Sequence, residues 1–313
     1  MKITFTSNKS MTDFINRKNG EVSFSEDIYL YNLFSRRGHE VTYIHPGDIK
    51  ADDSGVYFAS EWKLNGGENQ FTRDISSVST EQINENSRPD ADVVFIRGLG
   101  EDESSKFQNE RTFFNHLFNL ENQVSLMLNS ARTTYFELKP EQKKLDLPFI
   151  ESWRVDSRDE LYDLIKEENG VVLKPDIGFM ARGVEYLSPD RSLESISEEV
   201  IRNSSFERVN SSKQEDRYIV MAGKPLFAQE FLRSGDVGKE KTIDTYFVPF
   251  EKQKLDVVYD AIDQTGLFYG AIDFKGDHLL EINGSGTGLG TIYGLYNLAS
   301  TICKSVEDKY NSL

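Results

Sequence analysis

The sequence is poor in the residues that build several common kinds of site. Its single cysteine, Cys303, excludes an internal disulfide framework and a zinc site with several cysteines. Cys303 lies in an apolar segment near the C-terminus, which is typical of a buried structural thiol rather than a reactive one. The four histidines, His39, His45, His116 and His278, are scattered without the spacing of metal ligands.

Long apolar runs are also missing. The N-terminus reads MKITFTSNKSM and has neither the apolar core nor the cleavage site of a signal peptide. No later stretch approaches the roughly eighteen apolar residues that a membrane-spanning helix needs. We therefore expect a cytoplasmic protein with no membrane partner.

Positive charge is scarce relative to negative charge. Lysine and arginine total 36, aspartate and glutamate total 52, and the net charge is −16. This balance opposes general binding to nucleic acids or anionic membranes, because both require a positive field over the protein surface. A polyanionic nucleotide can still bind through a local cluster of cations.

The chain does have enough apolar material for several cores. Hydrophobic residues make up 38% and aromatics 12% of 313 residues, a length that usually folds as two or three packed subdomains. In the first 130 residues short apolar segments alternate with helical ones, which indicates a parallel α/β domain. The expected strands are 2–6, 40–44, 92–97 and 124–129, the expected helices are 24–38 and 104–120, and 50–88 is assigned to edge strands and loops.

After Pro148 the pattern of elements changes. The expected strands are 170–175, 184–187, 226–232, 241–248 and 267–274, and the expected helices are 159–168, 193–203 and 291–310. Residues 271–283 are expected to form a hairpin that turns at 275–277. The sequence shows no internal repeat and no low-complexity tract.

The first segment with chemical potential covers residues 171–187. An apolar strand ends in Lys174 and Pro175 and runs into a turn with Gly178 and Gly183. This arrangement places a cation beside a loop flexible enough to close over phosphates. A lysine at the end of a strand is more often a solvated surface residue, but the three apolar residues before Lys174 indicate that its backbone is buried.

The second segment covers residues 226–236. An apolar strand is interrupted by Gln229 and Glu230 and resumes with Phe231 and Leu232. A linker between two lobes can present its backbone N–H and C=O groups to an adenine ring while apolar side chains cover the ring. Taken alone, the same pattern is that of an edge strand.

The third segment is the hairpin 271–283. Asp273 and Glu281 lie on facing arms, and Asn283 is two residues beyond Glu281, so that both point to the same face of their strand. Three oxygen-bearing side chains then converge, as a magnesium ion shared with substrate phosphates requires. The alternative is a solvated hairpin with polar residues on its outer face, which the apolar residues around them disfavour.

The chain resembles the ATP-grasp superfamily in the order and spacing of four motifs. They are Lys-Pro before a glycine-containing loop, Gln-Glu-Phe-Leu, Gly-x-x-Asp and Glu-Ile-Asn. Within this superfamily the chain is most similar to prokaryotic glutathione synthetase, because Arg-Arg-Gly-His-Glu-Val at 36–41, an apolar strand ending in Arg97 and Leu-Asn-Ser at 128–130 come before them. The resemblance spans nearly the whole chain. It implies an α/β protein of the ATP-grasp fold, with a parallel α/β domain at 1–130 and two α+β lobes, at 131–211 and 212–313, that clamp ATP.

The same resemblance implies roles for individual residues. The expected catalytic cations are Lys174, Arg182 and Lys241, the last in the place of an arginine of the family. The expected ATP contacts are Lys174, Lys139 (with Arg132 as its substitute), Gly178, Gln229, Glu230, Phe231, Leu232 and Asp236. The expected ligands of Mg²⁺, or of Mn²⁺ in its place, are Asp273, Glu281 and Asn283.

The implied reaction joins a small-molecule carboxylate to an amine through an acyl phosphate, with positioned cations and Mg²⁺ rather than a protein nucleophile. Relatives suggest a homo-oligomer. Two departures from the family matter: the phosphate loop holds fewer glycines, and only 52 positions separate Gln229 from Glu281, so that a strand and loop that help bind phosphate and acceptor are missing. The expected function is a glutathione synthetase-like ligase. Its nearest alternative, which the shortened region favours, is an ATP-grasp ligase that acts on another amino acid, peptide or natural-product precursor.

Two alternatives from other classes remain. A nucleotide-binding regulatory protein without turnover would not need the oxygen ligands at Asp273, Glu281 and Asn283. A dinucleotide oxidoreductase is suggested by the glycines at 284–290, but Leu289 occupies the place of the third glycine of that fingerprint.

Overall fold

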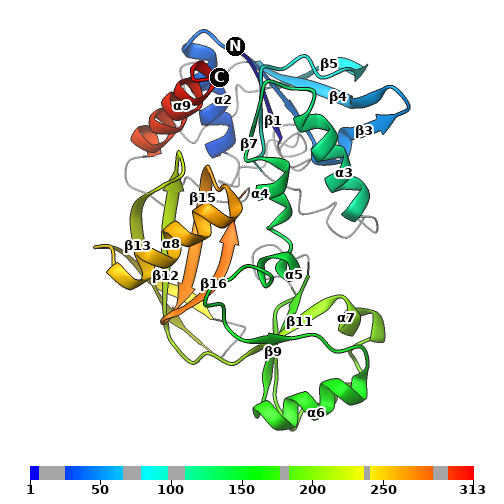
Figure 1. The fold of residues 1–313 in the computed structure, drawn as a ribbon, viewed down its shortest axis with the longest axis vertical. Helices are drawn as coiled ribbons and strands as arrows, with labels where there is room; N and C mark the ends of the chain where they lie inside the picture. The colour runs from blue at the N-terminus through cyan, green and yellow to red at the C-terminus, as the bar shows by residue number, and fades with distance from the viewer. Residues whose placement is uncertain (7–24, 66–78, 98–109, 177–182, 236–239, 285–294) are drawn as a thin grey trace. The chain divides into compact units, whose positions relative to one another are not determined.

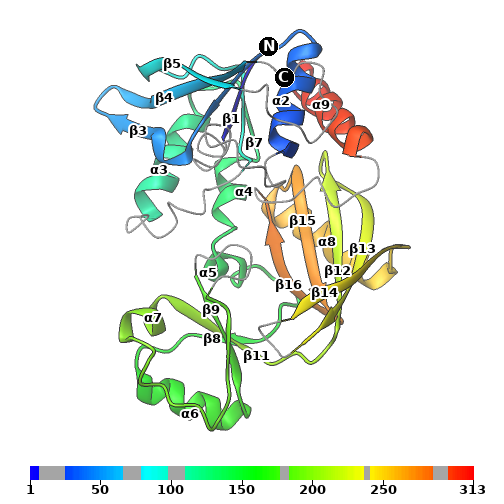
Figure 2. The same ribbon diagram turned by 180° about the vertical axis from the view of Figure 1, so that it is seen from behind.

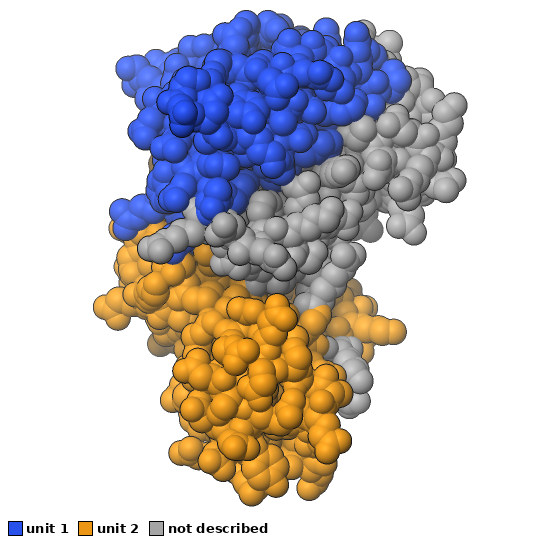
Figure 3. Space-filling view, turned by 90° about the vertical axis from the view of Figure 1, so that its right-hand side faces the viewer, with its two compact units in different colours: residues 1–135, 266–270, 284–313 blue, residues 136–265, 271–283 orange. Residues whose placement is uncertain are grey.

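The structure is a computed structural model that describes residues 1–6, 25–65, 79–97, 110–176, 183–235, 240–284 and 295–313. The chain divides into two compact units (Figure 3). The first holds residues 1–135, 266–270 and 284–313, and the second holds 136–265 and 271–283. Among the described residues, no helix combines the length and the apolar character needed to span a membrane.

The first unit is built on a seven-stranded sheet. Its strands are β1 (Lys2–Thr6), β2 (Glu40–Ile44), β3 (Ile49–Asp52), β4 (Gly55–Asn65), β5 (Ser79–Ser87), β6 (Val93–Phe95) and β7 (Leu126–Leu128). β2, β1, β6 and β7 run parallel in that order, and β4 continues the sheet antiparallel with β3 and β5 paired to it. The parallel strands β1, β6 and β7 are almost entirely buried, as strands covered on both faces are, and β6 and β7 consist of apolar residues alone.

Helices lie on both sides of this sheet (Figure 1). They are α2 (Ser25–Arg36), the 3-10 helix η2 (Pro46–Asp48), α3 (Glu110–Glu121), α4 (Ala131–Tyr135) and α9 (Leu295–Asn311). α9 packs against α2, and the two are joined where Arg37 Nε and His39 Nε2 contact Glu307 Oε1 at 2.6 and 2.8 Å. The parallel α/β domain expected from the sequence is confirmed, but the closing helix packs in the first unit, whereas the sequence grouped it with residues 212–313.

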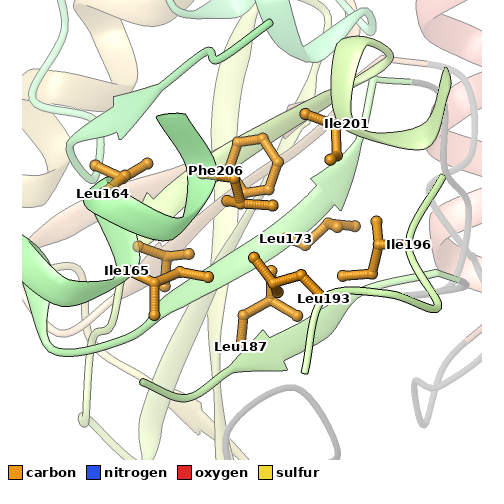
Figure 4. Close-up of a cluster of buried hydrophobic side chains, with 10 residues drawn as sticks. Leu164, Ile165, Leu173, Leu187, Leu193, Ile196, Ile201 and Phe206 are labelled. Carbon is orange, nitrogen blue, oxygen red and sulfur yellow. The ribbon is translucent and has the colours of Figure 1, made fainter. Parts of the chain in front are cut away.

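The second unit contains a four-stranded antiparallel sheet in the order β10-β9-β11-β8. Its elements are α5 (Lys139–Gln142), β8 (Ser152–Trp153), α6 (Arg158–Glu168), β9 (Val171–Pro175), β10 (Glu185–Leu187), α7 (Glu198–Arg202) and β11 (Ser204–Arg208). Leu164 and Ile165 of α6 pack on Leu173 and Phe206 of the sheet in a buried apolar cluster (Figure 4). α6 begins at Ser157, whose side chain accepts a hydrogen bond from the Glu160 N–H, an arrangement that stabilises helix starts.

The second unit also contains a five-stranded sheet in the order β14-β13-β12-β15-β16. Its elements are β12 (Gln214–Met221), β13 (Lys224–Ser234), β14 (Lys241–Val248), α8 (Lys252–Thr265), β15 (Tyr269–Lys275) and β16 (His278–Asn283). α8 covers one face of this sheet, in front of it in Figure 1 and behind it in Figure 2. The opposite face is therefore the one that carries the charged residues described below.

The structure adds several elements to those expected from the sequence, among them η2, α4, α5 and β8. β11, β12 and α8 fill the stretches 204–221 and 252–265, to which no element was assigned. β12 starts with four polar residues, which hides its strand character, and its turn to β13 uses Ala222 and Gly223 with φ of 53° and 70°. Two positive φ values in a two-residue turn suit the twist of a hairpin, although Ala-Gly is not one of the usual sequence signals for it.

Candidate active site

Lys139 is fixed beside the hairpin of β15 and β16 by a residue on its own short helix. Gln142 Nε2 donates to the Ile282 carbonyl at 2.8 Å, and the Ile282 N–H donates to Gln142 Oε1 at 3.0 Å. Both groups are buried, so these two hydrogen bonds hold α5 against β16. The Lys139 ammonium forms an ion pair with Glu281. Of the expected lysines, this one therefore reaches the expected metal-binding hairpin.

Lys174 lies at the end of β9 and shares a carboxylate with a second lysine. Its Nζ is 2.6 Å from Glu207 Oε2, and Lys143 Nζ is 3.1 Å from Glu207 Oε1. The Glu207 side chain is only 4% exposed, so the two ammonium groups compensate a carboxylate that has lost most of its water. Lys143 Nζ also donates to the Ile150 carbonyl at 3.0 Å.

Asp273, Glu281 and Asn283 are brought together by the register of the hairpin. Asp273 pairs directly with Glu281 across the two strands, and Asn283 Nδ2 donates to Asp273 Oδ2 at 3.0 Å and to Glu281 Oε1 at 3.1 Å. Arg217 on β12 holds Asp273 through two hydrogen bonds of 2.7 Å each. The part of the chain that the structure describes contains no group of three His, Cys, Asp or Glu residues suited to a metal. A metal here would therefore use two carboxylates and one amide oxygen, which are oxygen donors of the kind that Mg²⁺ prefers.

Burial and neighbouring charges shift the pKa values of four groups of this cluster. Burial raises the pKa of Glu281, but Lys139 and Lys174 lower it by more, so that it lies well below its ordinary value. Burial lowers the pKa of Lys139, and the Glu281 carboxylate more than restores it. The Asp273 carboxylate raises the pKa of Arg217 despite partial burial. Burial lowers the pKa of Lys143, and Lys174 and Lys139 lower it further against the opposing effect of Glu207.

Four cations thus meet three carboxylates in a protein whose net charge is −16. They are Lys139, Lys143, Lys174 and Arg217 against Glu207, Asp273 and Glu281. A local excess of cations is what a polyanionic phosphate group needs in an otherwise acidic molecule.

The segment expected to link two lobes has a different place in the structure. Gln229–Leu232 lies in β13, between β12 and β14 within one sheet, so the prediction that it forms a linker is wrong. Gln229 is buried, and Glu230 accepts a hydrogen bond from Gln214 Nε2 at 2.6 Å. The Phe231 ring faces two guanidinium groups. The chain passes from the four-stranded to the five-stranded sheet at residues 209–213, between β11 and β12.

The remaining expected residues fall outside the cluster or outside the described chain. Lys241 opens β14, where it is exposed and pairs with Ser234 at the edge of the sheet. Gly178, Arg182 and Asp236 lie outside the described residues.

Three residues of the cluster were not expected from the sequence: Lys143, Glu207 and Arg217. Arg217 was missed with its strand, although the apolar run 218–221 before Ala222 and Gly223 is a usable strand signal. If the sequence around Ala222 and Gly223 is interpreted as a hairpin, Arg217 lies opposite Gln229, on the face of the sheet that carries the other charges. Glu207 and Lys143 had no such signal, because a charged residue at the end of a strand or short helix is usually solvated.

No family model matches the chain, and no curated protein matches it. Solved structures do resemble it. The ATP-grasp ligase PsnB complexed with a minimal precursor is 17% identical over 97% of this chain and 98% of its own, with a TM-score of 0.58. A RiPP-associated ATP-grasp ligase from Chryseobacterium gregarium, in complex with ADP and a leader and core peptide, is 16% identical over 98% and 97%, with a TM-score of 0.61. The D-cycloserine synthetase DcsG is 11% identical over 99% and 100%, with a TM-score of 0.63. At these identities the likeness is one of architecture, and it shows that this chain has the ATP-grasp fold.

Proposed function

We propose that this protein is an ATP-dependent carboxylate–amine ligase. The observation that carries the proposal is the convergence, within one unit, of three lysines and an arginine with the carboxylates of Asp273, Glu281 and Glu207. Such a cluster on an ATP-grasp fold provides both the cations that phosphates need and the oxygen ligands that a phosphate-bound metal needs.

The residues of the cluster take separate roles in this proposal. Lys139 and Lys174 bind the phosphates of ATP, and Lys143 keeps Glu207 compensated when Lys174 turns to them. Asp273, Glu281 and the Asn283 amide oxygen hold Mg²⁺, or Mn²⁺ in its place. When bound, the ion supplies positive charge that offsets the charge developing on the transferring phosphoryl group.

The reaction itself requires no nucleophile from the protein. The substrate carboxylate takes the γ-phosphoryl group, ADP leaves, and an amine then attacks the acyl carbon and releases phosphate with formation of an amide. Burial raises the pKa of Cys303, the one cysteine of the chain, to about 12, so that its thiol does not ionise at neutral pH. This agrees with a mechanism that depends on positioned charge.

The adenine is best placed beside the linker at residues 209–213. A linker between two sheets can offer backbone groups to the ring, and β13, to which the sequence assigned this role, is not a linker. Lys174 on β9 pairs with Ser205 on β11, and β11 leads directly into this linker, so a phosphate bound at Lys174 would lie beside the strand that enters the linker.

The acceptor is best assigned to peptides or natural-product precursors. Two of the similar structures are described as complexes with precursor or leader and core peptides, and the third is named for D-cycloserine synthesis. The short distance in sequence between Gln229 and Glu281 points the same way. A glutathione synthetase-like reaction is the second candidate, supported by the motifs of the first 130 residues.

The test is a substrate screen with an isotope readout. The protein is incubated with ATP, Mg²⁺ and panels of carboxylates and amines that include acidic peptides, γ-glutamyl dipeptides and free amino acids. We expect ADP and a new amide by mass spectrometry, and ¹⁸O from a labelled carboxylate in the released phosphate, because an acyl phosphate transfers that oxygen. ADP with glycine and a γ-glutamyl dipeptide alone would select the glutathione-type reaction. ATP binding without ADP formation across the panels would make the protein a nucleotide-binding regulator.

A further inference from the structure

The carboxylates of the candidate metal site are surrounded by N–H donors. Arg217 Nε and Nη2 donate to the two oxygens of Asp273 at 2.7 Å each. The amide nitrogen of Asn283 donates to Asp273 at 3.0 Å and to Glu281 at 3.1 Å, and the Lys139 ammonium pairs with Glu281. These donors occupy carboxylate lone pairs that a metal ion would use.

A divalent cation therefore competes with three groups for these carboxylates. Arg217 and Lys139 repel it, because like charges a few ångströms apart inside a protein are strongly unfavourable. Asn283 presents its amide nitrogen, which only donates hydrogen bonds, so its side chain must turn over to offer its oxygen to a metal. Asp273 and Arg217 are bound in the two-point geometry that makes arginine–carboxylate pairs strong, and the Asp273 side chain is only 8% exposed.

We propose that Arg217, assisted by Lys139, is a displaceable counter-ion that excludes free divalent metal from the site and admits it only together with a polyphosphate. The inference rests on the proposed function. A polyphosphate offers the two cations another anion, so that the carboxylates are released to the metal without leaving Arg217 and Lys139 uncompensated. Because of Arg217, the protein then binds the metal–nucleotide complex rather than the free metal.

The chain provides a matched control for Arg217. Phe231 lies between two guanidinium groups, with Arg217 Cζ 5.5 Å and Arg233 Cζ 5.4 Å from its ring centroid. Arg233 pairs with Glu215 instead of with Asp273. Replacing either arginine with methionine removes one positive charge and one contact with the same ring, but only Arg217→Met frees an expected metal ligand.

In the experiment, the full chain without nucleotide is titrated with Mn²⁺, and electron paramagnetic resonance measures the free and bound Mn²⁺. We expect weak binding in the wild type and in Arg233→Met, and binding at least about tenfold tighter in Arg217→Met, because a repelling charge and a competing donor are both removed. Mn²⁺ should also raise the thermal midpoint of Arg217→Met more than that of Arg233→Met. Equal Mn²⁺ affinities in the two variants would overturn the proposal.

A second variant keeps the test decisive if Arg217→Met does not fold. Lys139→Met frees Glu281 instead of Asp273, and we expect it also to bind Mn²⁺ more tightly than the wild type. No gain there, in a folded protein, would count against the counter-ion role. Calorimetry of the wild type with ATP–Mg²⁺ distinguishes failure of this proposal from failure of the proposed function. If the wild type binds ATP–Mg²⁺ but the variants bind Mn²⁺ no more tightly than it does, only the counter-ion role is wrong. If the wild type does not bind ATP–Mg²⁺, the proposed function is wrong.

Discussion

Asp273 and Glu307 are each held by an arginine through two hydrogen bonds, in different units of the molecule. Arg37 and His39 bind Glu307 where α9 packs on α2, and no second carboxylate shares that contact among the described residues. Arg217 binds Asp273 directly opposite Glu281, with Lys139 and Asn283 in the same cluster. The first pair joins two helices, whereas the second compensates one of two carboxylates that face each other across a hairpin.

The difference is in what the arginine compensates. A single carboxylate that contacts cations is stabilised by them, and no further charge has to be compensated. Two carboxylates placed side by side are costly unless cations lie between them, and such crowding of like charges is common at functional sites. We therefore expect the Glu307 contact to matter for stability and the Asp273–Glu281 cluster to matter for nucleotide chemistry.

The largest expected effect comes from Glu281→Gln. The substitution keeps the shape of the side chain and removes one negative charge, so turnover of ATP with its substrates should fall about a hundredfold or more, because the metal-binding charge is lost. The measurement is ADP release under saturating substrate. The matched change in the other pair, Glu307→Gln, should leave turnover within about twofold. Turnover by Glu281→Gln at the wild-type rate would show that the hairpin is structural.

Asn283→Asp should be milder than Glu281→Gln. The new side chain keeps an oxygen for the metal but adds a third negative charge and loses the amide donors to Asp273 and Glu281. We expect turnover to fall about tenfold, with lower thermal stability in the absence of metal and nucleotide, because the added charge is repelled. If Asn283→Asp is as inactive as Glu281→Gln, the amide itself is required.

A smaller effect is expected on nucleotide affinity when Lys174 is removed. Lys174→Ala takes away a partly buried cation, so ATP–Mg²⁺ binding should weaken by about 2 kcal/mol, or roughly thirtyfold. Calorimetry measures this directly. Lys241→Ala is the control, because Lys241 is exposed at the edge of its sheet and should change affinity little. Equal losses in the two variants would remove the special role of Lys174.

The sequence predicted the fold where short-range patterns matched the final arrangement. The strands of the first unit and the hairpin of β15 and β16 have the composition and turns expected of them, and the hairpin reverses in the two-residue turn that begins at Gly276, with φ of 61°. The pairing of Asp273 with Glu281 depends further on a shift of register between Asp273 and Phe274, which no local pattern in the sequence shows. What the sequence did not show depends on tertiary contacts. Lys143 follows α5 and reaches Glu207 on β11, while Arg217 on β12 reaches Asp273 on β15, so each contact joins segments far apart in the sequence.

The expected linker at 229–232 is the part of the fold that the sequence pattern could not identify. An apolar strand with two polar residues in its middle looks the same whether it crosses between lobes or lies inside a sheet. Gln229 is buried by its neighbours in β12 and β14, and no local pattern records that pairing. The motif Gln-Glu-Phe-Leu was therefore assigned by resemblance to the wrong place in the fold.

The pair at Glu307 should give a distinct pH dependence of stability. Hydrogen bonds from Arg37 lower the pKa of Glu307 from 4.5 to about 2, with His39 adding to the effect against partial burial. A carboxyl with a lowered folded-state pKa contributes stability that is fully present above about pH 4.5 and is lost as the pH falls towards 2. Allowing for solvent screening, we expect Glu307→Gln to cost about 1 kcal/mol at pH 7 and less at pH 3. Urea unfolding at the two pH values measures this, and a difference that does not shrink at pH 3 would contradict the assignment.

The smallest expected effect is on the thiol of Cys303, which reports on the same helix. Cys303 is buried on α9 four residues before Glu307, and burial raises its pKa to about 12, so a thiol reagent should react only when α9 opens. If the Glu307 contact holds α9 on α2, Glu307→Gln should speed labelling up to about fivefold, in proportion to roughly 1 kcal/mol of lost stability. Glu281→Gln is the control, because its side chain belongs to the other unit, and it should leave the labelling rate unchanged. Faster labelling in both variants would mean that Cys303 is exposed by global unfolding, and the Glu307 contact would then have no separate part in holding the helix.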